Sequence, residues 1–411
     1  MGRRVRRGGL VGAAVLGLLA GAGCPARAAG AAGPDAYAYR AAPDARPVQG
    51  SRDPADGPLL RPGPGTYTDS LRPGERKFYT VELDAASSAY VSAVAAPRPG
   101  TAMGPQDGIE VALQKADGTQ CGVGRHRTFL SAGGPYPVAD YAERVAPGGG
   151  TGGPCALAGT YRFTVKRGEA TGGDAGALPV ELAYTAGEGG APSAGATEGG
   201  GGAAGTGFGD AVELRPGTRE DRLRPGQTRF YRVAAGTGQQ LAVAARFGAA
   251  AGGDPGPFVI NGVRLGLHNA ARGYVMNRTA GYRGETVELS LTTPPVAPDG
   301  GDPGKGASDA ERGMRLPGWY YLQVSLNPKA SAGTADGLPV TLDVQVGAPR
   351  AADARRGMRA TPRHQAAPAG DGRHATRRIV GYAGIGTGSA LLLGLGAWTL
   401  AARRGPAEPT R

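Results

Sequence analysis

The sequence predicts an all-β protein: two tandem domains of the β-sandwich or jelly-roll type, plus one C-terminal transmembrane helix. Three observations predict this class. Glycine (75) and proline (34) together exceed a quarter of the 411 residues, which is typical of turns and short strands rather than long helices. A seventeen-residue segment occurs twice, within runs that alternate apolar and polar residues. One stretch of 24 residues without a charge, 379–402, lies near the carboxyl end.

The repeat relates residues 65–81 (GTYTDSLRPGERKFYTV) to residues 217–233 (GTREDRLRPGQTRFYRV), with ten of seventeen positions identical. Two later landmarks recur in the same order: GTYRFTV at 159–165 matches GWYYLQV, and LPVEL at 178–182 matches LPVTL. Three landmarks in one order predict two homologous domains of about 130 residues each.

Each landmark predicts a β-strand, because apolar residues recur at every second position. Arg72-Pro-Gly-Glu75 and Arg224-Pro-Gly-Gln227 have the composition of tight turns, with Pro fixing φ and Gly accepting positive φ. We therefore expect each domain to open with a hairpin, formed by 66–71 with 76–83 and by 218–223 with 228–233. Further strands are predicted at 89–95, 109–115, 241–247, 258–267 and 286–293.

The opening pattern Y-x-D-x-L-x-P-G-E-x-x-F-Y-x-V from Tyr67, the segment IEVALQKADG at 109–118 and the late GTYRFTV resemble bacterial pre-peptidase C-terminal domains. The resemblance implies jelly-roll-like sandwiches that bind substrate or surface polymers, or that assist secretion. In this sequence no protease domain accompanies the repeats, and the second repeat lacks a clean Asp-Gly strand. The resemblance therefore transfers no metal or ligand residues.

The amino terminus has the three parts of a secretory signal: basic residues in 1–7, an apolar run over 8–20 and the small residues of Ala26-Arg27-Ala28. This pattern predicts cleavage after Ala28. Lipoprotein processing at Cys24 is the alternative, although Gly21 stands where lipoproteins favour a branched apolar residue.

Residues 379–402 predict a transmembrane helix, since 24 residues in an α-helix span about 36 Å. With a cleaved signal in front, the bulk of the chain is expected outside the cell membrane and the short tail inside. Gly386, Ala390 and Gly394 recur every four residues, a spacing that lets two helices pack closely. Chance occurrence in a glycine-rich helix is the alternative explanation of that spacing.

The net charge of +12 lies mostly at the ends of the chain. Residues 1–28 contain five arginines and no acid, 347–378 contain eight arginines against two aspartates, and 403–411 contain three arginines against one glutamate. Residues 29–346 are therefore within one charge of neutral, and we expect no nucleic-acid partner. The arginines beside the membrane either attract anionic lipid or wall polymer, or only keep a spacer soluble.

Once residues 1–28 are removed, Cys121 and Cys155 are the remaining cysteines, and an exported pair predicts a disulfide. The motifs of serine hydrolases, zinc peptidases and phosphate-binding loops do not occur, so the sequence predicts no catalytic residues, no metal and no cofactor. Calcium binding by the acidic loop 299–311, which contains Asp299, Asp302, Asp309 and Glu311, is left open because its spacing fits no known motif.

Aromatic residues at strand positions either line a carbohydrate surface or pack in the core, and core packing is the expectation for most of them. These residues are Tyr67, Tyr79, Tyr161, Trp319, Tyr320 and Tyr321.

The predicted segments are a signal peptide (1–28), a flexible N-terminal segment (29–58), a first sandwich (59–185), a Gly-rich linker (186–209), a second sandwich (210–346), an Arg-rich disordered stalk (347–378), the transmembrane helix (379–402) and a cytoplasmic tail (403–411). The hypothesis that follows is a non-enzymatic, single-pass cell-surface protein whose paired sandwiches bind envelope polymer or a partner protein. One alternative is an accessory subunit of a cell-envelope or secretion complex, assembled through the transmembrane helix. Another is an extracellular hydrolase without a recognisable motif.

Overall fold

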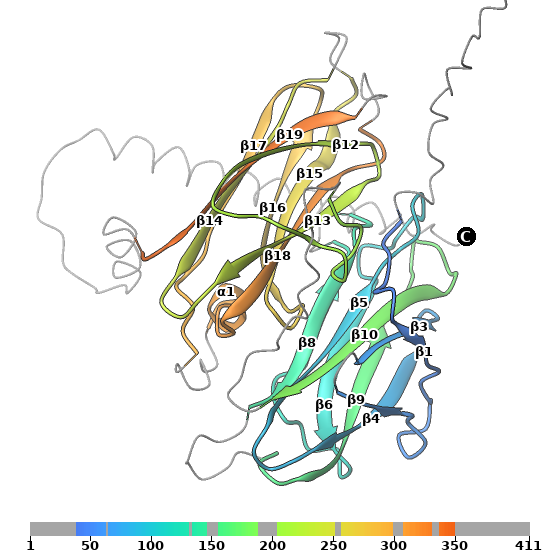
Figure 1. Cartoon of the computed structure of the whole chain (residues 1–411). Coiled ribbons are helices and arrows are strands. Elements are labelled where there is room, and N and C mark those ends of the chain that lie inside the picture. The colour runs from blue at the N-terminus through green and yellow to red at the C-terminus, as the bar shows by residue number, and fades with distance from the viewer. Residues whose placement is uncertain are drawn as a thin grey trace, which may run out of the picture. The chain divides into compact units, whose positions relative to one another are not determined.

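The computed structural model describes residues 38–62, 65–130, 134–145, 155–187, 204–250, 256–298, 307–330 and 337–349 (Figure 1). The predicted signal peptide, stalk, transmembrane helix and tail lie outside the described residues, and so do Cys24, Ala28, Gly386, Ala390 and Gly394. Within the described ranges, no helix reaches the length and apolar content that crossing a bilayer requires.

The first half of the described chain forms two five-stranded sheets, which we name sheet A and sheet B. Sheet A has the order β1-β3-β10-β5-β8: β1 (Arg46–Pro47), β3 (Gly65–Leu71), β10 (Leu178–Gly187), β5 (Ser88–Ala95) and β8 (Val138–Arg144). Sheet B has the order β2-β4-β9-β6-β7: β2 (Leu59–Leu60), β4 (Arg76–Leu83), β9 (Gly159–Arg167), β6 (Gly108–Lys115) and β7 (Arg125–Thr128).

The second half forms sheets C and D (Figure 1). Sheet C has the order β11-β13-β18-β15-β16: β11 (Val212–Glu213), β13 (Thr228–Ala235), β18 (Gly318–Leu326), β15 (Val259–His268) and β16 (Tyr274–Tyr282). Sheet D has the order β12-β19-β14-β17: β12 (Gly217–Leu223), β19 (Leu338–Gly347), β14 (Gln240–Phe247) and β17 (Val287–Thr292). One short helix, α1 (Asp309–Gly313), precedes β18.

The strand order of the first half is repeated in the second. Sheet D corresponds to sheet A without β1, and sheet C corresponds to sheet B, strand for strand in chain order. The repeated sequence thus folds into a repeated topology. Each half is a β-sandwich, because one continuous apolar core takes side chains from both of its sheets. In the first sandwich, for example, Leu71 and Leu182 of sheet A meet Val81 and Phe163 of sheet B.

The predicted opening hairpins are wrong. The turns themselves form as expected: Glu75 N–H donates to Arg72 O at 3.0 Å and Gly74 has φ of +67°. However, β3 pairs with β10 in sheet A, while β4 pairs with β9 in sheet B, and β12 and β13 separate in the same way. The apolar alternation of two consecutive strands is satisfied equally when they lie side by side and when they face each other across a core. The choice is made by strands a hundred residues later.

Two segments predicted to be flexible are packed where the structure describes them. In the N-terminal segment, β1 joins the edge of sheet A, and Gly50 N–H donates to Asp69 at 2.8 Å. At the end of the predicted linker, Phe208 is only 4% exposed and Gly205 bridges to Phe230. A composition rich in Gly and Ala hid the one aromatic residue that anchors this segment.

Candidate functional site at the junction of the sandwiches

The outer faces of sheets A and C are buried against each other, which is unusual for antiparallel sheets with one solvent face. Val94 and Ala139 of sheet A share an apolar cluster with Phe230 and Tyr321 of sheet C and with Phe208. A second cluster joins Tyr90 and Tyr141 of the first sandwich to Ala270, Ala271 and Leu316 of the second. We name this contact between the two sandwiches the junction.

Glu181, an outward-facing residue of β10, lies at the centre of the junction with a side chain that is 1% exposed. It accepts a hydrogen bond of 2.5 Å from the hydroxyl of Tyr39 and one of 2.6 Å from Nη1 of Arg272. Burial, followed by the charge of Glu181, raises the pKa of Tyr39 well above its ordinary value, so the hydroxyl stays protonated and donates. One carboxylate thus ties the N-terminal segment, the first sandwich and the second sandwich together.

The backbone of Arg272 adopts positive φ (61°), which is uncommon for a residue with a side chain. It lies in the turn between β15 and β16, where the side-chain oxygen of Asn269 accepts from the N–H groups of Ala271 and Gly273 at 3.1 and 2.8 Å. This asparagine holds the turn in place. The strain at Arg272 is maintained by the local structure and directs the guanidinium to Glu181.

A second ionic contact crosses the junction at Arg127 of β7. Its Nε donates to Asp140 at 2.6 Å within the first sandwich, and its Nη1 donates to Asp309 of α1 at 2.9 Å. A capping box between Ser308 and Glu311 begins α1 and fixes the position of Asp309. Asp309 and Glu311, two members of the predicted acidic loop, therefore have these contacts, while Asp299 and Asp302 lie outside the described residues. Within the described ranges, no three His, Cys, Asp or Glu side chains are grouped as metal ligands.

A third contact passes through His268, which is 1% exposed on β15. The side-chain N–H of Gln323 donates to Pro137 O in the first sandwich at 3.0 Å, so its oxygen accepts from Nε2 of His268 at 3.1 Å. Burial, with the nearby charge of Arg264, lowers the pKa of His268 to about 3. His268 is therefore neutral and has a structural role at the junction.

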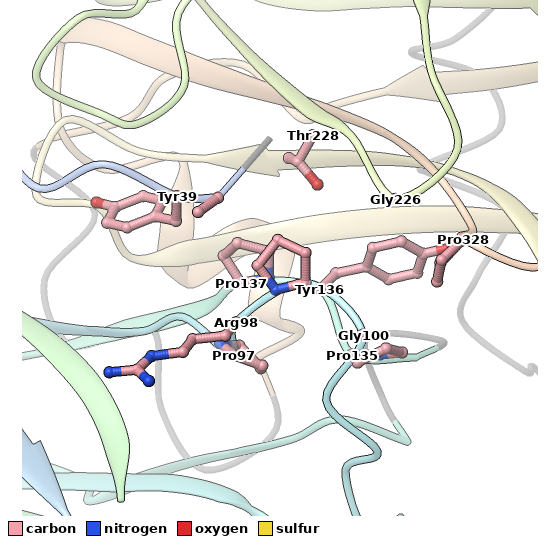
Figure 2. Close-up of a pocket in the computed structure, with 12 residues that line it drawn as sticks. Tyr39, Pro97, Arg98, Gly100, Pro135, Tyr136, Pro137, Gly226, Thr228 and Pro328 are labelled. Atoms are coloured by element: carbon pink, nitrogen blue, oxygen red, sulfur yellow. The ribbon is translucent and has the colours of Figure 1, made fainter. Parts of the chain in front are cut away.

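Two cavities open at the edge of the junction and share Ala38, Tyr39, Pro97 and Arg98. The larger one measures about 240 Å³ and lies over Thr68, Pro179 and Glu181. The smaller one measures about 30 Å³ and is drawn in Figure 2, where Pro135, Tyr136 and Pro137 of the first sandwich face Gly226, Thr228 and Pro328 of the second. Arg98 extends away from these prolines in Figure 2 and is exposed. We name the two cavities together the junction groove.

The disulfide predicted between Cys121 and Cys155 is confirmed and links the loop after β6 to the segment before β9. The expectation of core packing holds for most of the aromatic residues, since Tyr67, Tyr79, Tyr161, Tyr320 and Tyr321 are all buried and Trp319 is half-buried. His126 is exposed on β7.

Sequence reasoning missed every residue of the junction. Tyr39, Glu181, Arg272 and Arg127 belong to no motif and come from four distant parts of the chain. One signal was available: Phe208 and Tyr39 are aromatic residues inside segments otherwise rich in Gly and Ala. Large aromatic side chains in such segments indicate a packing partner.

No family model and no curated protein sequence matches the chain, so the resemblance to pre-peptidase C-terminal domains stays a prediction. Among solved structures, it is similar to the CBM22-1-CBM22-2 tandem domain of Paenibacillus barcinonensis Xyn10C, with 10% identity over 69% of this chain and 86% of that one and a TM-score of 0.19. It is also similar to an uncharacterised protein of Burkholderia cenocepacia (8% identity, 69% and 81% covered, TM-score 0.20) and to a secreted protein of Parabacteroides distasonis (7%, 69% and 88%, TM-score 0.18). At these TM-scores the likenesses carry no argument about the function of this chain.

Proposed function

We propose that the chain is a non-enzymatic cell-surface protein whose paired sandwiches bind an envelope polymer or a segment of a partner protein in the junction groove. The observation that supports this proposal is the groove itself, a concave surface between two docked domains. Binding sites occur preferentially at such interfaces, where walls from both sides enclose a ligand. The predicted stalk and transmembrane helix would hold this groove at the outer face of the membrane.

The lining of the groove favours an extended ligand with an apolar surface. Its walls contain Pro97, Pro135, Pro137 and Pro328 together with Tyr136, side chains that lose little conformational entropy on binding. The larger cavity of about 240 Å³ exceeds the roughly 150 Å³ known to accept a benzene ring, so it has room for one side chain or the apolar face of one sugar. Arg98 at the rim adds a positive charge for an anionic group of the ligand.

Cosedimentation of the purified full-length protein with an insoluble cell-wall fraction tests the proposal. Ala41 lines the larger cavity, so Ala41→Leu should narrow it and weaken binding by about tenfold, equivalent to 1.4 kcal/mol. Ala55→Leu, at an exposed position outside the groove, is the matched control and should bind like the unmodified protein.

Photo-crosslinking from position 98 in intact membranes tests the arm of the proposal that concerns a partner protein. A crosslinked product that Ala41→Leu removes and Ala55→Leu retains would support the groove as the binding site. Binding and crosslinking that are equal in both variants would remove the groove from the proposal.

A further inference from the structure

Arg264 is a cation buried at the junction, with 1% of its surface exposed. It lies on β15, where Ser325 and Thr279 are its neighbours on the adjacent strands. A Cβ at Gly266 would stand 3.0 Å from both terminal nitrogens of Arg264, so the guanidinium lies over the glycine backbone. From the first sandwich, the ring of Tyr136 approaches it, with 5.8 Å between the guanidinium carbon and the ring centroid. Residues of both sandwiches therefore enclose the charge.

No carboxylate of the described residues pairs with Arg264. Its Nε and Nη1 are buried and have no hydrogen-bond partner in the protein. The other two arginines at the centre of the junction are paired: Arg272 with Glu181, and Arg127 with Asp140 and Asp309. Burial lowers the pKa of Arg264 to about 10, which leaves the guanidinium positively charged at neutral pH.

We propose that Arg264 binds a small monovalent anion of the chloride size class and that this anion stabilises the contact between the two sandwiches. The Nε–H and Nη1–H groups are two donors on one edge of a rigid guanidinium. An unpaired charge is costly in a low-dielectric interior, and a neutral water molecule would satisfy the donors without compensating that charge. An anion does both.

The enclosure of Arg264 sets the size of the ligand. Tyr136 also lines the smaller cavity of the junction groove, whose volume of about 30 Å³ is that of one water molecule. A halide or formate has this size, whereas gluconate and polymeric anions do not. The site is therefore separate from the polymer or peptide binding proposed for the groove.

Thermal unfolding of the full-length protein at constant sodium concentration tests the site. Replacing gluconate by chloride should raise the unfolding midpoint of the unmodified protein by roughly 3–6 °C, with saturation as chloride passes its dissociation constant. Formate in a parallel series distinguishes a preference for carboxylates from one for halides. Arg264→Met should abolish the response to chloride and to formate. Arg278→Met, which alters an exposed arginine on the neighbouring strand β16, should retain the response.

An equal response to chloride in the unmodified protein and in Arg264→Met would overturn the proposal, and so would no response in either. Because Arg264→Met alters a buried position, crystals of the unmodified protein grown in bromide give a second measurement. An anomalous peak within hydrogen-bond distance of Nε of Arg264 supports the site. Well-diffracting crystals at saturating bromide without such a peak contradict it.

Discussion

Arg272 of the second sandwich donates from Nη1 to Oε1 of Glu181 in the first at 2.6 Å, and the two side chains are only 13% and 1% exposed. Tyr39 donates to the other oxygen of the same carboxylate. The contact between two independently formed cores thus depends on one buried negative charge. Polar contacts of this kind specify a single arrangement of two surfaces, because any other arrangement leaves charges buried and unpaired.

Glu181→Gln should therefore destabilise the protein strongly. The substitution keeps the shape of the side chain but leaves the buried guanidinium of Arg272 without its counterion, at an expected cost of about 3–5 kcal/mol in the free energy of unfolding. Urea denaturation measures this loss. The exposed pair Arg246–Glu288 is the matched control, with side chains 66% and 55% exposed, and Glu288→Gln should change stability by less than about 0.5 kcal/mol. Equal effects of the two substitutions would contradict a structural role of the buried pair.

Stability should fall as the pH drops from 7 to 5 because of His268. The pKa of His268 is about 3 in the folded chain, against roughly 6.5 in an unfolded one. Below pH 6.5 the unfolded chain binds a proton that the folded chain does not, so acid favours unfolding. The expected loss at pH 5 is about 2 kcal/mol, measured as the shift in the urea midpoint. His268→Asn should flatten this dependence, and His126→Asn, at an exposed position, should leave it in place.

Removal of the disulfide should cost about 3–4 kcal/mol, since it closes a loop across a sequence separation of 34 residues. The double variant Cys121→Ser and Cys155→Ser should unfold at a lower urea concentration than the oxidised protein. Reduction of the unmodified protein should produce the same shift. If the double variant and the oxidised protein unfold together, the bond contributes no net stability.

The two sandwiches contain equivalent buried polar clusters, and their response to the same substitution should match. Tyr79 donates to Asp69 at 2.8 Å beside Lys77, and Tyr231 donates to Asp221 beside Arg229, each 152 residues later in the chain. Tyr79→Phe and Tyr231→Phe should each cost roughly 1.5–3 kcal/mol, because a hydrogen bond to a charged group is lost inside a core. Denaturation of the single variants checks this, and a phenylalanine variant as stable as the unmodified protein would contradict it.

The sequence predicted the local elements of the fold well. Strands such as β5, β6, β14 and β17 lie within a residue or two of the expected ranges, because alternation over six to eight residues is a local property. Strands β8 and β16 were missed. Tyr141 on β8 faces the second sandwich, so β8 is buried on both faces and has no alternation to detect.

The arrangement of those elements could not be predicted in the same way. The pairing of β3 with β10 joins residues more than a hundred positions apart, and nothing near β3 in the chain specifies it. The junction is harder still, because Glu181 and Arg272 occupy positions that look solvent-exposed when each sandwich is considered alone. Only the docking of two surfaces turns an outward-facing glutamate into a buried one.

The two copies use different faces at the junction: the first uses sheet A, and the second uses sheet C, the counterpart of sheet B. A head-to-tail contact of this type leaves sheets B and D free and would, with identical copies, continue into a filament. The apolar pair Val94 and Ala139 of sheet A corresponds in sheet D to the charged pair Arg246 and Glu288. On sheet B, Arg162 replaces Tyr321. Charge on the two outermost faces therefore stops self-assembly after one duplication and keeps neighbouring chains from polymerising.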